Sequence, residues 1–104
     1  MGSGRSDPVA FVQDAGIKVA IGATTVEITS LTAGERYRLS AQGGGAAVRI
    51  GADDASSANG GFDFAVLNGE SVYVRGLGTT INVIELDATS DAAAALYIQR
   101  VSSD

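Results

Sequence analysis

Short runs of alternating apolar and polar residues, rich in Val, Ile and Thr, recur along most of this chain. Clusters of Gly, Asn, Asp and Ser separate the runs. Successive side chains of a strand point to opposite faces, so this alternation is typical of strands that have one buried face. Turn signals at roughly 8–12-residue spacing are typical of sandwiches. The sequence therefore predicts an all-β fold.

About eight strands are expected, and the alternation also predicts which face of each is buried. In the run 36–41, Tyr37 and Leu39 fall on the apolar face and both arginines on the polar face. The run 80–86 is apolar at nearly every residue in its middle, so it is expected to be covered on both faces. Asn68-Gly69 favours a hairpin, because both residues tolerate positive φ. The predicted strands are 17–21, 24–29, 36–41, 46–50, 62–66, 71–75, 80–86 and 94–101. Their spacing favours a single small β-sandwich of jelly-roll type.

The chain has 104 residues, which suits one domain. Residues 16–104 are assigned to the β-sandwich and residues 1–15 to a flexible N-terminal arm, because two glycines and Pro8 oppose regular structure near the start. Val9, Phe11 and Val12 are apolar enough to dock such an arm on a neighbouring subunit. The same three residues could instead begin the first strand, and the sequence leaves both alternatives open.

Residue types that carry much of enzyme chemistry are missing. The chain has no His and no Cys, which excludes Ser-His relays, thiol nucleophiles and typical zinc sites. Carboxylate chemistry needs two acidic groups that face each other across a deep cleft, and a domain of this size rarely encloses one. We therefore expect no enzymatic activity and no cofactor. The net charge of −5 and the scattered basic residues argue against nucleic acid and against an anionic membrane as partners.

The loop 51–61 holds the best candidates for a metal site, although they are weak ones. Asp53 and Asp54 lie in it and Asp63 follows shortly after, so their oxygens could contribute to a calcium site. The ligand spacing of an EF-hand loop and its closing Glu are absent. A solvated polar loop is the simpler interpretation, and contact with a partner is the other functional one.

Tyrosines are the other candidates for binding. Tyr73 and Tyr97 are out of phase with their apolar neighbours, so we expect them to be exposed. They could form a platform for a sugar, or they could belong to an oligomer interface, where exposed Tyr beside Arg75 or Arg100 is favourable. The candidate partner-binding residues are Val9, Phe11, Val12, Tyr73, Arg75 and Tyr97.

Several stretches together resemble a group of small β-sandwich virion proteins of tailed bacteriophages, of the capsid-decoration or head-associated type. They are Thr24–Ile28, Gly34-Glu35-Arg36-Tyr37-Arg38-Leu39, Ala46-Ala47-Val48-Arg49-Ile50-Gly51, Phe62–Val66, Asn68-Gly69-Glu70-Ser71-Val72-Tyr73-Val74 and Ile81–Leu86. The resembling region covers roughly residues 17–101. Its motifs are turn and alternation patterns of low specificity, so no residue role carries over.

The resemblance implies a capsid decoration or cement subunit that binds the assembled phage head and stabilises it, located in the virion after assembly in the host cytoplasm. The major capsid protein or other virion subunits would be its partners, and a homo-oligomer, most simply a trimer, is expected. A neck, tail or head-fibre component is the alternative within this class. A carbohydrate- or receptor-binding module is the alternative from another class.

Overall fold

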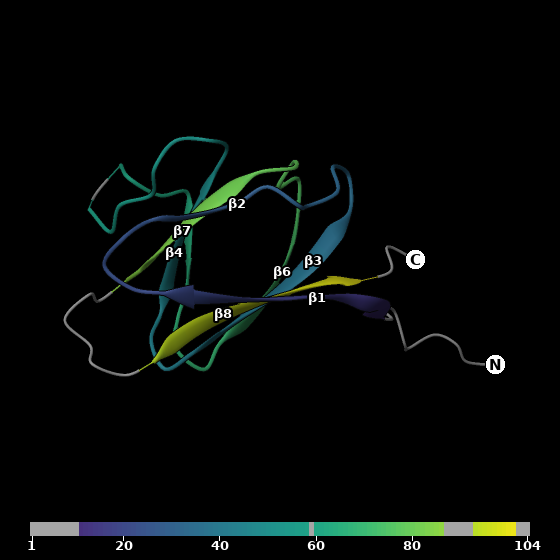
Figure 1. Cartoon of the computed structure of the whole chain (residues 1–104), viewed down its shortest axis with the longest axis horizontal. Helices are drawn as coiled ribbons and strands as arrows, with labels where there is room; N and C mark the ends of the chain where they lie inside the picture. Colours follow the sequence, from purple (N-terminus) through teal and green to yellow (C-terminus); the bar gives the residue numbers. More distant parts are fainter. Residues whose placement is uncertain (1–10, 59, 87–92, 102–104) are drawn as a thin grey trace.

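The computed structural model describes residues 11–58, 60–86 and 93–101, and these form eight strands (Figure 1). The strands are β1 (Phe11–Ile21), β2 (Val26–Ile28), β3 (Arg36–Gln42), β4 (Ala46–Ile50), β5 (Phe64–Val66), β6 (Ser71–Arg75), β7 (Ile81–Glu85) and β8 (Ala94–Val101). Each overlaps one of the predicted runs. Within these ranges there is no helix with the length and hydropathy needed to cross a membrane.

The strands form two four-stranded sheets, in the orders β1-β8-β3-β6 and β2-β7-β4-β5. All strand pairs are antiparallel. The first strand pairs with the last, β2 with β7, β3 with β6, and β4 with β5, and these pairs alternate between the sheets. This is the topology of a jelly roll, in which the chain forms one long antiparallel hairpin whose four strand pairs are distributed alternately over two sheets. The predicted fold, an all-β sandwich of jelly-roll type, is therefore confirmed.

The core lies between the sheets and is built by the predicted alternation. In β3, Tyr37, Leu39 and Ala41 are buried, whereas Arg36 and Arg38 are only partly buried on the other face. The Tyr37 hydroxyl accepts a hydrogen bond from the Thr32 backbone N–H at 2.7 Å, which satisfies its polar end. From the other strands the core receives mainly Val, Ile, Leu and Ala, in agreement with the low aromatic content.

Strand β7 is covered on both faces, as predicted from its nearly continuous apolar run. It lies between β2 and β4 in the second sheet. Ile81 and Val83 point into the core, and Asn82, on the opposite face, is only 1% exposed. Residues of the long loop between β4 and β5 provide this second cover, because Asn82 donates a hydrogen bond to the Gly51 carbonyl at 3.0 Å.

The predicted boundary between arm and domain, at residues 15 and 16, falls inside a strand. β1 already begins at Phe11, so Phe11 and Val12 belong to the sandwich. Phe11 is opposite the buried Val101 of β8, and an irregularity in the register separates this pair from the regular pairing that starts at Gly16. Pairing with the far end of the chain therefore extends the first strand. Val9 and the rest of the proposed arm, 1–10, lie outside the described residues.

Candidate functional site

The outward face of the β1-β8-β3-β6 sheet carries a concentration of basic and aromatic side chains, which we call the basic face. Every second residue of each strand points outward, and these outward residues form the face. The register then places Arg38 opposite both Gln99 and Tyr73, and Ser40 opposite both Tyr97 and Ser71. The basic face consists of Phe11 and Lys18 on β1, Tyr97 and Gln99 on β8, Arg36, Arg38 and Ser40 on β3, and Ser71, Tyr73 and Arg75 on β6.

Arg38 lies at the centre of the basic face and is held on both sides. Its Nη1 donates to Oε1 of Gln99 at 3.1 Å, and its Nη2 donates to Oγ of Ser71 at 3.0 Å. The Ser71 hydroxyl is itself hydrogen-bonded to that of Ser40. The guanidinium also lies 5.9 Å from the centroid of the Phe11 ring. These contacts restrict the rotamers of Arg38, so little of its side-chain entropy remains to be lost when a partner binds.

Cations lie over the exposed aromatic rings of this face. Arg36 is 5.3 Å from the centroid of the Tyr73 ring, and Lys18 is 5.9 Å from that of Tyr97. These distances fall within the range of cation–π attraction. Tyr73 is 46% exposed, Tyr97 37% and Phe11 53%, so large apolar surfaces remain in contact with solvent. The predicted exposure of Tyr73 and Tyr97 is confirmed, and exposed Tyr beside Arg is the composition that dominates protein interfaces.

The charged side chains that the structure describes on the basic face are all cations. Lys18, Arg36, Arg38 and Arg75 lie on it, in a protein whose net charge is −5. Among the strand residues of this sheet whose side chains the structure describes, none is acidic. Arg36 and Arg38 lie on the same side of β3 through alternation alone. Lys18 and Arg75 join them only because β3 pairs with β6 and, through β8, lies in one sheet with β1. The alternation predicts that these two residues point outward but does not predict their place beside β3.

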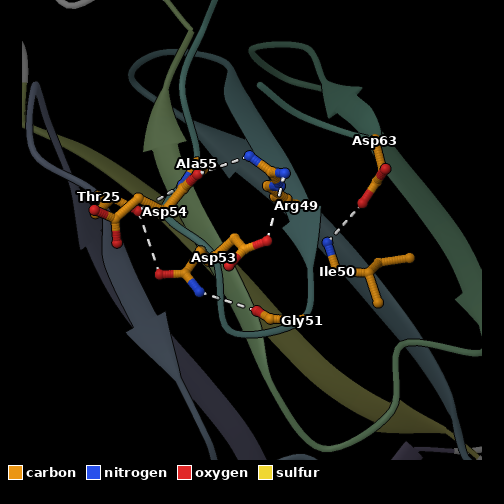
Figure 2. A network of polar contacts seen from close by, with 9 residues as sticks. Thr25, Arg49, Ile50, Gly51, Asp53, Asp54, Ala55 and Asp63 are labelled. Carbon is orange, nitrogen blue, oxygen red and sulfur yellow. Dashed lines mark hydrogen bonds and ion pairs between the residues drawn. The ribbon is translucent and has the colours of Figure 1, made fainter. Parts of the chain in front are cut away.

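The opposite side of the sandwich is acidic. Glu27 points outward from β2, and the segment between β4 and β5 contributes three exposed carboxylates, so we call Glu27, Asp53, Asp54 and Asp63 the acidic face. Arg49 of β4 lies among them, with Nη2 3.6 Å from Oδ2 of Asp53 and Nη1 donating to the Asp54 carbonyl at 3.3 Å (Figure 2). The Asp53 side chain remains 81% exposed.

Hydrogen bonds to the sheet hold the acidic loop in place. Besides its bond to Gly51, Asn82 accepts at Oδ1 a hydrogen bond of 3.3 Å from the Thr25 hydroxyl. The same hydroxyl oxygen accepts one from the Ala55 N–H at 3.1 Å (Figure 2). At the base of the loop, Oδ2 of Asp63 accepts a hydrogen bond from the Ile50 N–H at 2.8 Å. Asn82 was missed by sequence reasoning, although a single Asn inside an apolar run is a signal of a buried polar contact.

Two of the three aspartates suggested for calcium have separate partners. Asp53 pairs with Arg49, and Asp63 receives a backbone N–H. In the described residues, which include all three, no group of three or more acidic side chains is arranged so that it could hold a metal ion. Calcium requires six to eight oxygen ligands. The loop has instead the geometry of a fixed surface that displays negative charge.

The two exposed tyrosines are on one face but do not form a continuous platform. Strand β3 lies between β6, which carries Tyr73, and β8, which carries Tyr97. Arg36 and Lys18 lie over the two rings. Stacking of a sugar requires an open ring face, so the carbohydrate alternative would require these cations to move.

Two further charged side chains lie outside both faces: Glu85 is buried and Arg100 is partly buried. Glu85 is only 3% exposed, and its Oε2 has no hydrogen-bond partner in the part of the chain that the structure describes. A Cβ on Gly44 would lie 2.6 Å from this oxygen, so the glycine makes room for it. Arg100 donates from Nη1 to the Thr32 hydroxyl at 3.1 Å and is directed away from the basic face, in phase with the core residue Ile98. Arg100 is thus not a neighbour of Tyr97 in the way that the sequence suggested.

Comparisons with protein-family models, with curated proteins and with solved structures give no match for this chain. Over the residues that the structure describes, the protein is an eight-stranded jelly roll with a basic, aromatic face on one sheet and a fixed acidic loop on the other.

Proposed function

We propose that this protein is a non-enzymatic structural subunit of a virion, a capsid decoration or cement protein that binds the assembled head of a tailed phage and stabilises it. The observation that carries the proposal is the basic face, where exposed Tyr73 and Tyr97 accompany a guanidinium that is already held in position. This is interface chemistry, and the jelly roll that presents it recurs among capsid proteins. The resemblance to small virion proteins points in the same direction.

The mechanism is mass action and needs no reaction at the site. A subunit that binds the assembled shell, and not the free shell protein, lowers the free energy of the assembled state. A rigid sandwich suits this task because the side chains of Arg38 and its neighbours are ordered before binding, which reduces the entropy lost on association. The major capsid protein or another virion subunit is the partner, and a homo-oligomer, of which a trimer is the simplest closed ring beyond the dimer, would bind through several copies at once. A neck, tail or head-fibre position would require the same kind of self-association.

The direct test is to find the protein in particles. Virions are purified on a density gradient from cells that carry the gene and have been induced to produce phage, and their proteins are quantified by mass spectrometry. We expect this chain at a constant ratio to the major capsid protein. Particles from which the gene has been deleted should release their DNA at a lower temperature and should recover when purified protein is added back. Purified particles without this chain would contradict the proposal.

The exposed tyrosines give the carbohydrate- or receptor-binding alternative its one specific support. A glycan array probed with the purified protein separates the two classes. Binding that is lost when Tyr73 and Tyr97 are both replaced by alanine, in a protein that does not enter particles, would favour the carbohydrate module. Under the virion proposal, no glycan binding is expected.

A further inference from the structure

We infer that copies of this protein associate head to tail, with the basic face of one copy against the acidic face of the next. This inference rests on the self-association included in the proposed function, and it specifies which surfaces meet. It assigns the basic face to contacts between copies, so the oligomer would bind the shell through surfaces outside this contact.

The basic face is unsuited to pairing with itself. In a two-fold symmetric dimer the same patch is used by both subunits. Such a dimer would bring Arg36, Arg38 and Arg75 of one copy close to the same cations of the other, with no acidic strand side chain described on this face to separate them. Like charges brought together in an interface cost several kcal/mol. A contact between two basic faces is therefore disfavoured.

The same chain displays a complementary surface. The net charge is −5 even though four cations lie on the basic face, so the rest of the sequence carries a large acidic excess. Part of that excess is concentrated in the acidic face, where Glu27, Asp53, Asp54 and Asp63 are all exposed. The two faces belong to different sheets, which lie on opposite sides of the core (Figure 1). They cannot meet within one molecule, but they can meet between two.

Both surfaces are ordered before contact. Arg38 is held by Gln99 and Ser71, and the acidic loop is anchored through Thr25 and Asn82. Association therefore loses little conformational entropy on either side. The exposed rings of Phe11, Tyr73 and Tyr97 supply the apolar area that charge pairs alone lack.

Unlike a two-fold contact, a head-to-tail contact does not end at two copies. Each added copy presents a free face of the same kind, so the assembly closes into a ring or continues as a stack. Because the contact is electrostatic and lies at the surface, it should weaken with salt, whose screening length falls from about 14 Å at 0.05 M to about 4 Å at 0.5 M.

The test uses two variants of the full chain, each lacking one face. R36Q/R38Q removes two of the four cations of the basic face, and D53N/D54N removes two of the four carboxylates of the acidic face. Light scattering after size exclusion should show a wild-type mass above that of a dimer, which decreases at high salt. Each variant alone should associate about tenfold more weakly. An equimolar mixture should form a 1:1 pair that grows no further, because each variant supplies the face that the other lacks.

A matched control is E35Q/E70Q, which removes two carboxylates outside both faces and changes the net charge as much as D53N/D54N does. It should associate like the wild type. Thermal unfolding of all variants, followed by circular dichroism, establishes that they are folded.

Three results would overturn the inference in distinguishable ways. A wild-type protein that is monomeric at every concentration and salt removes self-association altogether, while its presence in purified particles is judged separately. An oligomer that neither variant weakens removes only the assignment of the two faces. Loss of association in R36Q/R38Q with no effect of D53N/D54N shows that the basic face contacts a surface other than the acidic face.

Discussion

The two outward faces of this sandwich are built by different means. On the basic face, the side chains stand on the outward side of four paired strands, and the backbone of each strand sets their direction. On the acidic face, a loop lies over the sheet, so that Asn82 of β7 is buried and most of the charge comes from residues 53–63. The first face is a product of alternation, whereas the second depends on a few hydrogen bonds between segments distant in sequence. The two should therefore respond differently to mutation.

The largest effect is expected at Asn82, the residue that joins the acidic loop to the sheet. Asn82→Ala removes the bonds to Gly51 and Thr25 from a side chain that is only 1% exposed. Left without partners in a buried position, these groups should lower the free energy of unfolding by about 2–3 kcal/mol. Urea unfolding measures the loss, and hydrogen exchange should show faster opening of residues 51–58. Thr25→Ser, which keeps the hydroxyl, is the control, and an unchanged stability of Asn82→Ala would show that the loop needs no such anchor.

A second test disturbs the loop and leaves the sheet intact. A Cβ on Gly61 would lie 2.5 Å from the Ser56 Cβ and 2.9 Å from its carbonyl oxygen, so Gly61→Ala must displace the loop backbone. We expect a loss of about 1–2 kcal/mol. The matched variant is Gly60→Ala, where φ is +85° but no atom lies within 4 Å of the added Cβ, so only the conformational cost of about 1 kcal/mol remains. Equal stability of the two variants in thermal unfolding would mean that the contact between Gly61 and Ser56 is not tight.

On the basic face, a substitution should affect stability less. Arg38→Ala removes two hydrogen bonds, but the Arg38 side chain is only partly buried. Water can therefore donate to Gln99 and Ser71 in place of the guanidinium. The free energy of unfolding should fall by no more than about 1 kcal/mol. Chemical denaturation measures this value, and a loss as large as that of Asn82→Ala would mean that Arg38 is a structural residue and not a surface prepared for contact.

Metal removal is expected to have the smallest effect. Asp53 and Asp63 have separate partners in Arg49 and the Ile50 N–H, so EDTA should leave the melting temperature unchanged and added CaCl₂ should not raise it. Differential scanning fluorimetry in both conditions provides the measurement. A clear upward shift with calcium, abolished in D53N/D54N, would indicate that the acidic loop rearranges around an ion.

Local pattern alone determined where the strands lie and which way their side chains point. The alternation around Tyr37 and Leu39 requires one buried face, since a shift by one residue would expose every apolar side chain of the strand. Asn68 and Gly69 similarly mark a turn, and Gly69 has φ +82°. These properties reside in a few consecutive residues, so they can be read without knowing any partner strand. The predicted hairpin at this turn is wrong, because β5 pairs with β4 and β6 pairs with β3 in the other sheet.

Only the tertiary structure decided which residues became neighbours. Every strand has the same period of two, so the pattern contains no information on whether β3 pairs with β6, β8 or neither. Arg38 meets Gln99 and Ser71 across separations of 61 and 33 residues, and Asn82 reaches Gly51 across 31. The start of β1 at Phe11 also depends on a residue distant in sequence, because Phe11 pairs with Val101 at the far end of the chain. Both faces therefore exist only in the folded protein, although the residue types that form them are visible in its sequence.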